Sequence, residues 1–180
     1  MKKILQLALL FLATFGLVRG VAAETRLLEM RNIDARVVRV KLDGVMEVRI
    51  RQGNVASLSI TADKRYIADV STAQSGDTLH IETEVRGFKI GPSSIRADLV
   101  LPNLRELSSE GFGSTDITGF KGEELTLSLE GAGSIKLVGD YRKLNASLGG
   151  VGSMQLWIGN NERAELDLQG AGSVVLGGRG

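Results

Sequence analysis

Four serines recur at one fixed position behind paired glycines. Each Gly-x-Gly-Ser copy ends in one of them: Ser114, Ser134, Ser153 and Ser173. Stacked in a column, their hydroxyls could line a polar ligand site, or they could bond to one another and to nearby backbone groups. As nucleophiles they would need a general base close by. The single histidine, His80, lies far outside these copies, so the pattern does not predict a serine hydrolase.

Other groups that could do chemistry are sparse. The chain has no cysteine, which excludes disulfides, thiol catalysis and cysteine-ligated zinc. Glu110 and Glu130 occupy the same position just before two successive glycine pairs; together they could hold a weak calcium ion or be a solvated surface pair. Glycosidase chemistry needs two carboxylates in a cleft with separate environments. We predict no catalytic residue, no cofactor and no metal site.

Trp157 is the only tryptophan and the leading candidate for a binding side chain. Its position within the repeat is shared with Thr118, Val138 and Gly177. Strand alternation points this position outward, where an indole could stack on a sugar or a partner protein. Alternatively, an irregular turn at Ile158 could rotate the ring inward, or the N-terminal region could cover it. The predicted ligand surface consists of Trp157, Val138, Lys136 and Gln155, with Phe120 and Tyr141 as weaker additions.

The glycines define a repeat that must position these side chains. The copies begin at Gly111, Gly131, Gly150 and Gly170, which are 20, 19 and 20 residues apart, and their second glycines are Gly113, Gly133, Gly152 and Gly172. Apolar and polar residues alternate on both sides of the glycines, which is typical of strands. Each copy is therefore a strand, a glycine corner, a second strand and a turn. Gly119, Gly139 and Gly159 mark that second turn, with Ile158 as an extra residue in the third copy.

Stacking is what lets such short units bury apolar surface. One inward column is predicted to contain Leu107, Leu127, Ala146 and Leu166, and another Ile117, Leu137, Leu156 and Leu176. Equivalent side chains pile up when the copies stack and their backbones pair in parallel. We therefore predict an all-β parallel β-helix, or β-solenoid, with coils of about 20 residues and repeats over 104–177.

The residues before this repeat are also β in character. Strands are predicted over 35–42, 46–51, 57–62, 78–84 and 95–101, separated by turn signals such as Asp43-Gly44 and Gly91-Pro92. Residues 64–70 fit either a short helical turn or another strand. No linker rich in proline or serine divides the chain, so we predict one domain over residues 24–180.

Residues 1–23 have the pattern of a secretory signal peptide. A basic start, Lys2-Lys3, precedes an apolar run over 4–18 and the small residues Val21-Ala22-Ala23. The run is shorter than the roughly 20 residues that span a bilayer, although an uncleaved anchor is the alternative. Cleavage would leave 19 basic and 21 acidic residues, a net charge of −2, which argues against binding nucleic acid through bulk charge. No later stretch reaches membrane-spanning length. We predict export to the periplasm or the outer cell surface.

An ordered set of segments resembles a known family. The segments are 48–53 (VRIRQG), 76–81 (GDTLHI), 97–104 (ADLVLPNL) and then the Gly-x-Gly-Ser copies. In this order they resemble the putative auto-transporter adhesin, head GIN domain family, over residues 25–177. The resemblance implies an exported, right-handed parallel β-helix in the bacterial envelope and supplies no catalytic residues. We expect a non-enzymatic adhesin or a ligand-binding or scaffolding module; the alternatives are a β-helix enzyme acting on a polysaccharide and a polymer-forming structural protein.

The expected partners follow from the predicted surfaces. A flat sheet face with Trp157 suits an envelope glycan or a protein. Only residues 174–180 follow the fourth Gly-x-Gly-Ser copy, so the last coil is expected to present an uncovered edge that pairs with another chain. The simplest closed product is a two-fold homodimer through the C-terminal end.

Overall fold

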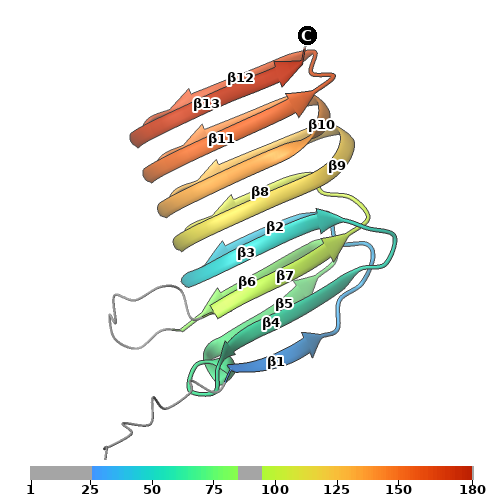
Figure 1. Ribbon diagram of the computed structural model, residues 1–180, viewed down its shortest axis with the longest axis vertical. Helices are drawn as coiled ribbons and strands as arrows, with labels where there is room; N and C mark the ends of the chain where they lie inside the picture. The colour runs from blue at the N-terminus through green and yellow to red at the C-terminus, as the bar shows by residue number, and fades with distance from the viewer. Residues whose placement is uncertain (1–25, 85–94, 180) are drawn as a thin grey trace, which may run out of the picture.

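The protein is an all-β molecule, as predicted from the alternation (Figure 1). The computed structural model describes residues 26–84 and 95–179. The strands are β1 (Arg26–Arg31), β2 (Arg39–Asp43), β3 (Val45–Gln52), β4 (Ser57–Asp63), β5 (Val70–Ser75), β6 (Thr78–Thr83), β7 (Ile95–Leu101), β8 (Glu106–Ser109), β9 (Phe112–Leu129), β10 (Ala132–Leu148), β11 (Val151–Gly159), β12 (Arg163–Leu168) and β13 (Ala171–Arg179). A single 3-10 turn, η1 (Ile67–Asp69), decides between the two possibilities for residues 64–70. The predicted signal peptide and the Gly91-Pro92 turn lie outside the described residues.

The strands form one mixed sheet that bends back on itself into a flattened, nearly closed form. One layer runs β1-β4-β7-β3 and continues through the first parts of β9 and β10 to β11 and β13. The other runs β5-β6-β2-β8 and continues through the second parts of β9 and β10 to β12. Figure 1 shows β9 and β10 curving from one layer into the other.

The prediction of parallel pairing throughout is wrong for the N-terminal part. Strands β1–β4, β4–β7 and β5–β6 pair antiparallel, whereas every pairing among β8 to β13 is parallel. Of the antiparallel pairs, β5–β6 is a tight hairpin with a positive φ of 61° at Gly76. Strand β4 instead pairs with β1 and β7, which are not its neighbours in the chain, while β2–β6 and β3–β7 are parallel. The structure therefore does not confirm a parallel β-helix over the whole chain.

The repeats stack in the register that their sequences predict. Ser134 lies opposite Ser114 on one side and Ser153 on the other, and Ser153 lies opposite Ser173. The inward columns are buried in the first three copies: Leu107, Leu127, Ala146, Ile117, Leu137 and Leu156 are at most 4% exposed. In the fourth copy the equivalent Leu166 and Leu176 are exposed, because no further strand covers them within the described residues.

A ladder of glycines forms the first corner. A side chain on Gly131 would collide with the carbonyl oxygen of Gly111, and a side chain on Gly150 would collide with that of Gly131. The Cα of each of these corner glycines therefore lies so close to the backbone of the coil below that any Cβ would collide with it, and only glycine fits there. The ladder begins one coil earlier than the repeat, because Gly111 itself lies against Gly44. The sequence pattern missed this coil, in which Met46 and Glu47 stand where later copies have glycine and serine.

The second turn differs from its prediction. Gly139 lies opposite Ile158, and Asp140 lies opposite Gly159, so Gly159 is not the equivalent of Gly139. The extra residue of the first copy instead forms a β-bulge in β9, where the register between β9 and β10 shifts at Gly139. The extra residue of the third copy falls after β11, in the turn where Asn160 has a φ of 51°.

Candidate functional site

The outward position of Trp157 is confirmed by the structure. The side chains of Trp157 and Val138 are 52% and 43% exposed and lie opposite each other on β11 and β10. They border a hollow of about 530 Å³, here called the apolar hollow, whose other walls include Ile158 and the backbone of Gly139 and Gly159. Gly119 and Gly178 also line the hollow. The indole is not rotated inward at Ile158, and in the described residues the N-terminal part leaves it half exposed.

The other predicted surface residues lie on the same face. Lys136 and Gln155 are exposed and lie opposite each other, two residues before Val138 and Trp157. They do not line the apolar hollow. The structure thus places all four predicted ligand-surface residues on one outer face, and brings Trp157 and Val138 together at its hollow.

The serine column also faces outward. Ser114, Ser134 and Ser153 are partly buried and Ser173 is exposed. Within the described part of the chain their hydroxyls make no hydrogen bond to one another, whereas Ser147 and Ser128, on the other layer, do so at 3.2 Å. The hydroxyls therefore do not form the self-bonded ladder considered above.

Tyr141 does not extend the surface, because it is buried, at 1% exposed, and does not line the apolar hollow. Phe120 is also buried, at 0% exposed, although it is among the residues that line the hollow. The Tyr141 hydroxyl donates a hydrogen bond of 3.0 Å to the carbonyl oxygen of Leu104, in the segment that joins β7 to β8. Burial raises the pKa of the Tyr141 phenol well above its ordinary value. Tyr141 therefore anchors this segment rather than binding a ligand.

Replacing Tyr141 with Phe is expected to lower the free energy of unfolding by about 1–2 kcal/mol, since the Leu104 carbonyl loses its buried donor. The unfolded phenol ionises near pH 10, whereas the folded one stays protonated to higher pH. The Tyr141 contribution is thus present below about pH 10 and is lost as pH rises above it. Denaturant melts of both proteins from pH 7 to 11 should show the gap between them closing above pH 10. A gap that is zero at pH 7 would contradict the anchoring role.

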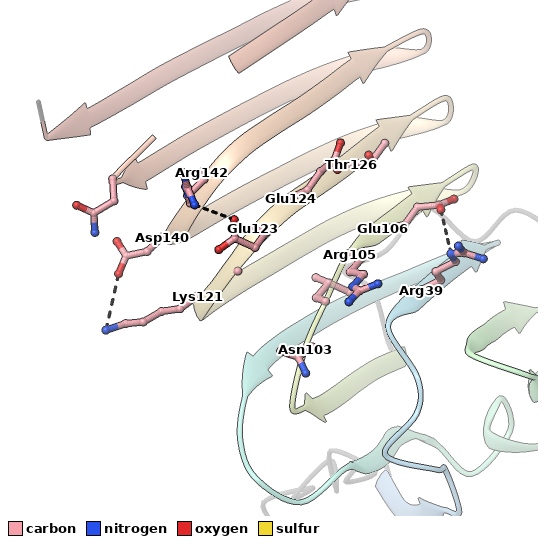
Figure 2. A pocket seen from close by; sticks show the side chains of 13 residues that line it. Arg39, Asn103, Arg105, Glu106, Lys121, Glu123, Glu124, Thr126, Asp140 and Arg142 are labelled. Atoms are coloured by element: carbon pink, nitrogen blue, oxygen red, sulfur yellow. Dashed lines mark hydrogen bonds and ion pairs between the residues drawn. The ribbon is translucent and has the colours of Figure 1, made fainter. Parts of the chain in front are cut away.

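A second concave region borders the first and was not predicted from the sequence. This charged groove, of about 960 Å³, is lined by Arg39, Asn103, Leu104, Arg105, Glu106, Lys121, Gly122, Glu123, Glu124, Thr126, Asp140, Arg142 and Asn160 (Figure 2). Its residues come from β2, β8, β9 and β10, from the segment before β8 and, for Asn160, from the turn after β11. Lys121 and Asp140 line both the groove and the apolar hollow, so the two form one continuous surface.

Ion pairs cross the charged groove between neighbouring strands. Arg39 lies 3.5 Å from Glu106, and Lys121 lies 3.9 Å from Asp140. Arg142 pairs with Glu162 at 2.8 Å and with Glu123 at 3.2 Å, and these carboxylates raise the pKa of its guanidinium. The groove therefore offers both donors and acceptors at fixed places. Only the register of distant strands brings these residues together, and no local spacing in the sequence signals it.

The remaining candidates, Glu110, Glu130 and His80, line neither the charged groove nor the apolar hollow. Glu110 and Glu130 are exposed just before neighbouring corners, and Glu130 accepts a hydrogen bond from Ser128 at 3.5 Å. His80 is exposed on β6. No cluster of three or more histidine, aspartate or glutamate side chains suited to a metal ion occurs within residues 26–84 and 95–179.

Comparisons with known proteins match the whole β domain. A family model described as "Putative auto-transporter adhesin, head GIN domain" matches residues 38–178. Similar crystal structures include a putative adhesin from Bacteroides fragilis (14% identity, TM-score 0.56, covering 86% of this chain and 98% of the other). A putative lipid binding protein from Parabacteroides distasonis (15%, 0.57, 87% and 96%) and a putative cell adhesion protein from Clostridium sporogenes (11%, 0.57, 86% and 100%) are similar too. At these identities the likeness shows the fold.

No curated protein matches the chain. Among the described residues, no helix combines the length and the apolar character required to cross a bilayer.

Proposed function

Because the chain belongs to the putative auto-transporter adhesin, head GIN domain family, we propose that it is an exported, non-enzymatic module that binds a glycan at the bacterial cell envelope. The observation that carries the proposal is Trp157, which is half exposed and lines the apolar hollow. An exposed indole offers a flat apolar surface to the C–H face of a sugar ring. The adjoining Lys121 and Asp140 supply a donor and an acceptor for hydroxyl groups.

A glycan-array screen of the protein without residues 1–23 tests this function. We expect binding to at least one class of polysaccharide, and Trp157→Ala should weaken that binding about tenfold or more, as loss of a stacked aromatic does. The matched control is Val151→Ala, which removes another exposed apolar side chain of β11 that does not line the hollow. Binding that survives Trp157→Ala, or binding to lipid vesicles and to no glycan, would contradict the proposal.

A carbohydrate-active enzyme is the alternative for the same ligand class. The carboxylates of Glu106, Glu123 and Asp140 are engaged in ion pairs along the groove, which favours holding a sugar over transferring a proton to it. Release of reducing ends from the bound polysaccharide would support the enzyme instead.

The family resemblance also supports a finer description of the fold and its location. We propose that β8 to β13 wind as coils of a right-handed parallel β-helix, and that residues 1–23 direct export and are removed. In-register parallel pairing of successive copies supports the first proposal. Mass spectrometry of protein recovered from the envelope fraction, with Glu24 as the expected first residue, tests the second.

The C-terminal edge is a proposed contact for a second copy. In the described residues, β12 pairs only with β10 and β13 only with β11, and Leu166, Leu168 and Leu176 are exposed. Unpaired strand edges beside apolar side chains favour pairing with another chain, and a two-fold dimer closes on itself. We expect sedimentation to show a concentration-dependent dimer that Val174→Lys disrupts. A monomer at every concentration, or a dimer that Val174→Lys leaves intact, would contradict this.

A further inference from the structure

One cation of the charged groove has no ionic partner. Arg39, Lys121 and Arg142 all lie within 4 Å of a carboxylate. The guanidinium of Arg105 makes no ion pair and no hydrogen bond within residues 26–84 and 95–179, and its side chain is exposed. Figure 2 shows Arg105 beside Glu106 and Arg39, which pair with each other instead.

The backbone of Arg105 is held in place from both sides. Its amide donates to the carbonyl of Val38 at 2.8 Å, and its carbonyl accepts from the amide of Thr126 at 2.9 Å. The adjacent Leu104 carbonyl accepts the buried Tyr141 hydroxyl at 3.0 Å. The unpaired guanidinium therefore extends from a backbone position that is fixed beside the groove.

Among the carboxylates that line the groove, Glu124 is the one with no ion pair within 4 Å in the described part of the chain, although Lys143 lies opposite it on β10. It accepts a hydrogen bond of 3.1 Å from the side-chain amide of Asn145. Its free acceptor capacity faces the same groove as Arg105. A ligand that satisfies both groups needs an anionic group, such as a carboxylate, for Arg105 and hydrogen-bond donors, such as hydroxyls, for Glu124.

We propose that the charged groove binds an acidic sugar, a uronic-acid unit of a polysaccharide, with its carboxylate on the guanidinium of Arg105. The inference rests on the proposed function, since the apolar hollow with Trp157 receives a neighbouring unit of the same chain across Lys121 and Asp140. Arginine suits this role because its planar fork matches a carboxylate with two parallel hydrogen bonds.

An acidic peptide is the competing ligand, and the groove disfavours it. Its side chains would bring carboxylates without hydroxyl groups. Each unit of an acidic sugar carries hydroxyl donors for Glu124 beside its carboxylate, whereas an acidic side chain brings only the carboxylate. The half-exposed Trp157 beside glycine backbone also matches a sugar ring better than a chain of short acidic side chains.

The test compares two probes that differ only in charge: galacturonate hexasaccharide and the same oligosaccharide with its carboxyl groups reduced to alcohols. Calorimetry with the full exported chain should show at least about tenfold tighter binding of the acidic probe. Arg105→Gln should remove that preference and leave the affinity for the reduced probe unchanged. The matched control is Arg49→Gln, which removes an exposed arginine of β3 that lines neither the charged groove nor the apolar hollow. This variant should retain the preference for the acidic probe.

The outcomes separate the two proposals. Equal affinity for both probes, with binding lost in Trp157→Ala, overturns the acidic-sugar inference and leaves glycan binding standing. A preference that survives Arg105→Gln overturns the role of Arg105. Displacement of the sugar by polyglutamate at equal charge concentration identifies an acidic peptide as the ligand and overturns the inference. Absence of binding to either probe or to any arrayed glycan overturns both proposals.

Discussion

Leu127→Asp is expected to abolish folding. Leu127 is completely buried between Leu107 and Ala146, its partners on the neighbouring coils. An aspartate there would be a buried charge without a partner, which costs at least about 4 kcal/mol. That is a large part of the roughly 5–15 kcal/mol that holds a domain folded. Circular dichroism and thermal melting of the purified variant give the readout.

The control for this change lies on the same strand. Thr118→Asp places the same charge at an exposed, outward position of β9, opposite Arg51, so it should leave the melting temperature nearly unchanged. A Leu127→Asp protein that melts like the wild type would show that the inward assignment of β9 is wrong.

Gly133→Val is expected to destabilise the protein by more than about 1 kcal/mol, and by up to about 3 kcal/mol if the neighbouring coils cannot separate. The new Cβ would collide with the carbonyl oxygen of Gly113 on the coil below. The cause is close approach and not backbone strain, since Gly133 is not among the residues with positive φ. Equilibrium unfolding in denaturant measures the difference.

Gly149→Val is the matched comparison. A side chain at this exposed glycine would meet only the Cγ of Glu130, at 3.8 Å, which is ordinary van der Waals contact. We expect a much smaller loss of stability there. Equal losses at the two positions would mean that valine disturbs strands or corners in general and that the glycine ladder is not the cause.

The sequence predicts the repeat portion of the fold well because one physical rule governs it. Side chains alternate with period two along a strand, so the buried column through Leu127 follows directly from copies spaced 19 or 20 residues apart. The first coil was missed because Met46 and Glu47 replace the second glycine and the serine. The antiparallel N-terminal pairs lie outside the repeat: β5–β6 is a hairpin through Gly76, and β4 lies between β1 and β7, which are distant from it in the chain.

Only part of the candidate site could be predicted, because alternation along a strand shows which way a side chain points but not which strands are neighbours in the sheet. Alternation places Trp157 outward, and the structure agrees. Tyr141 was misplaced because the second turn brings its ring under the segment of Leu104. The charged groove combines residues as far apart as Arg39 and Arg142. Their proximity depends on the order of strands in the sheet, which single-strand patterns do not contain.

The sole tryptophan makes one measurement decisive for glycan binding. Trp157 fluorescence reports directly on the apolar hollow, because no other indole contributes. Titration of the protein without residues 1–23 with galacturonate hexasaccharide is predicted to shift the emission to shorter wavelength and to saturate at the affinity found by calorimetry, as a half-exposed ring becomes covered. Saturable binding by calorimetry with an unchanged emission spectrum would contradict the placement of the ligand at Trp157.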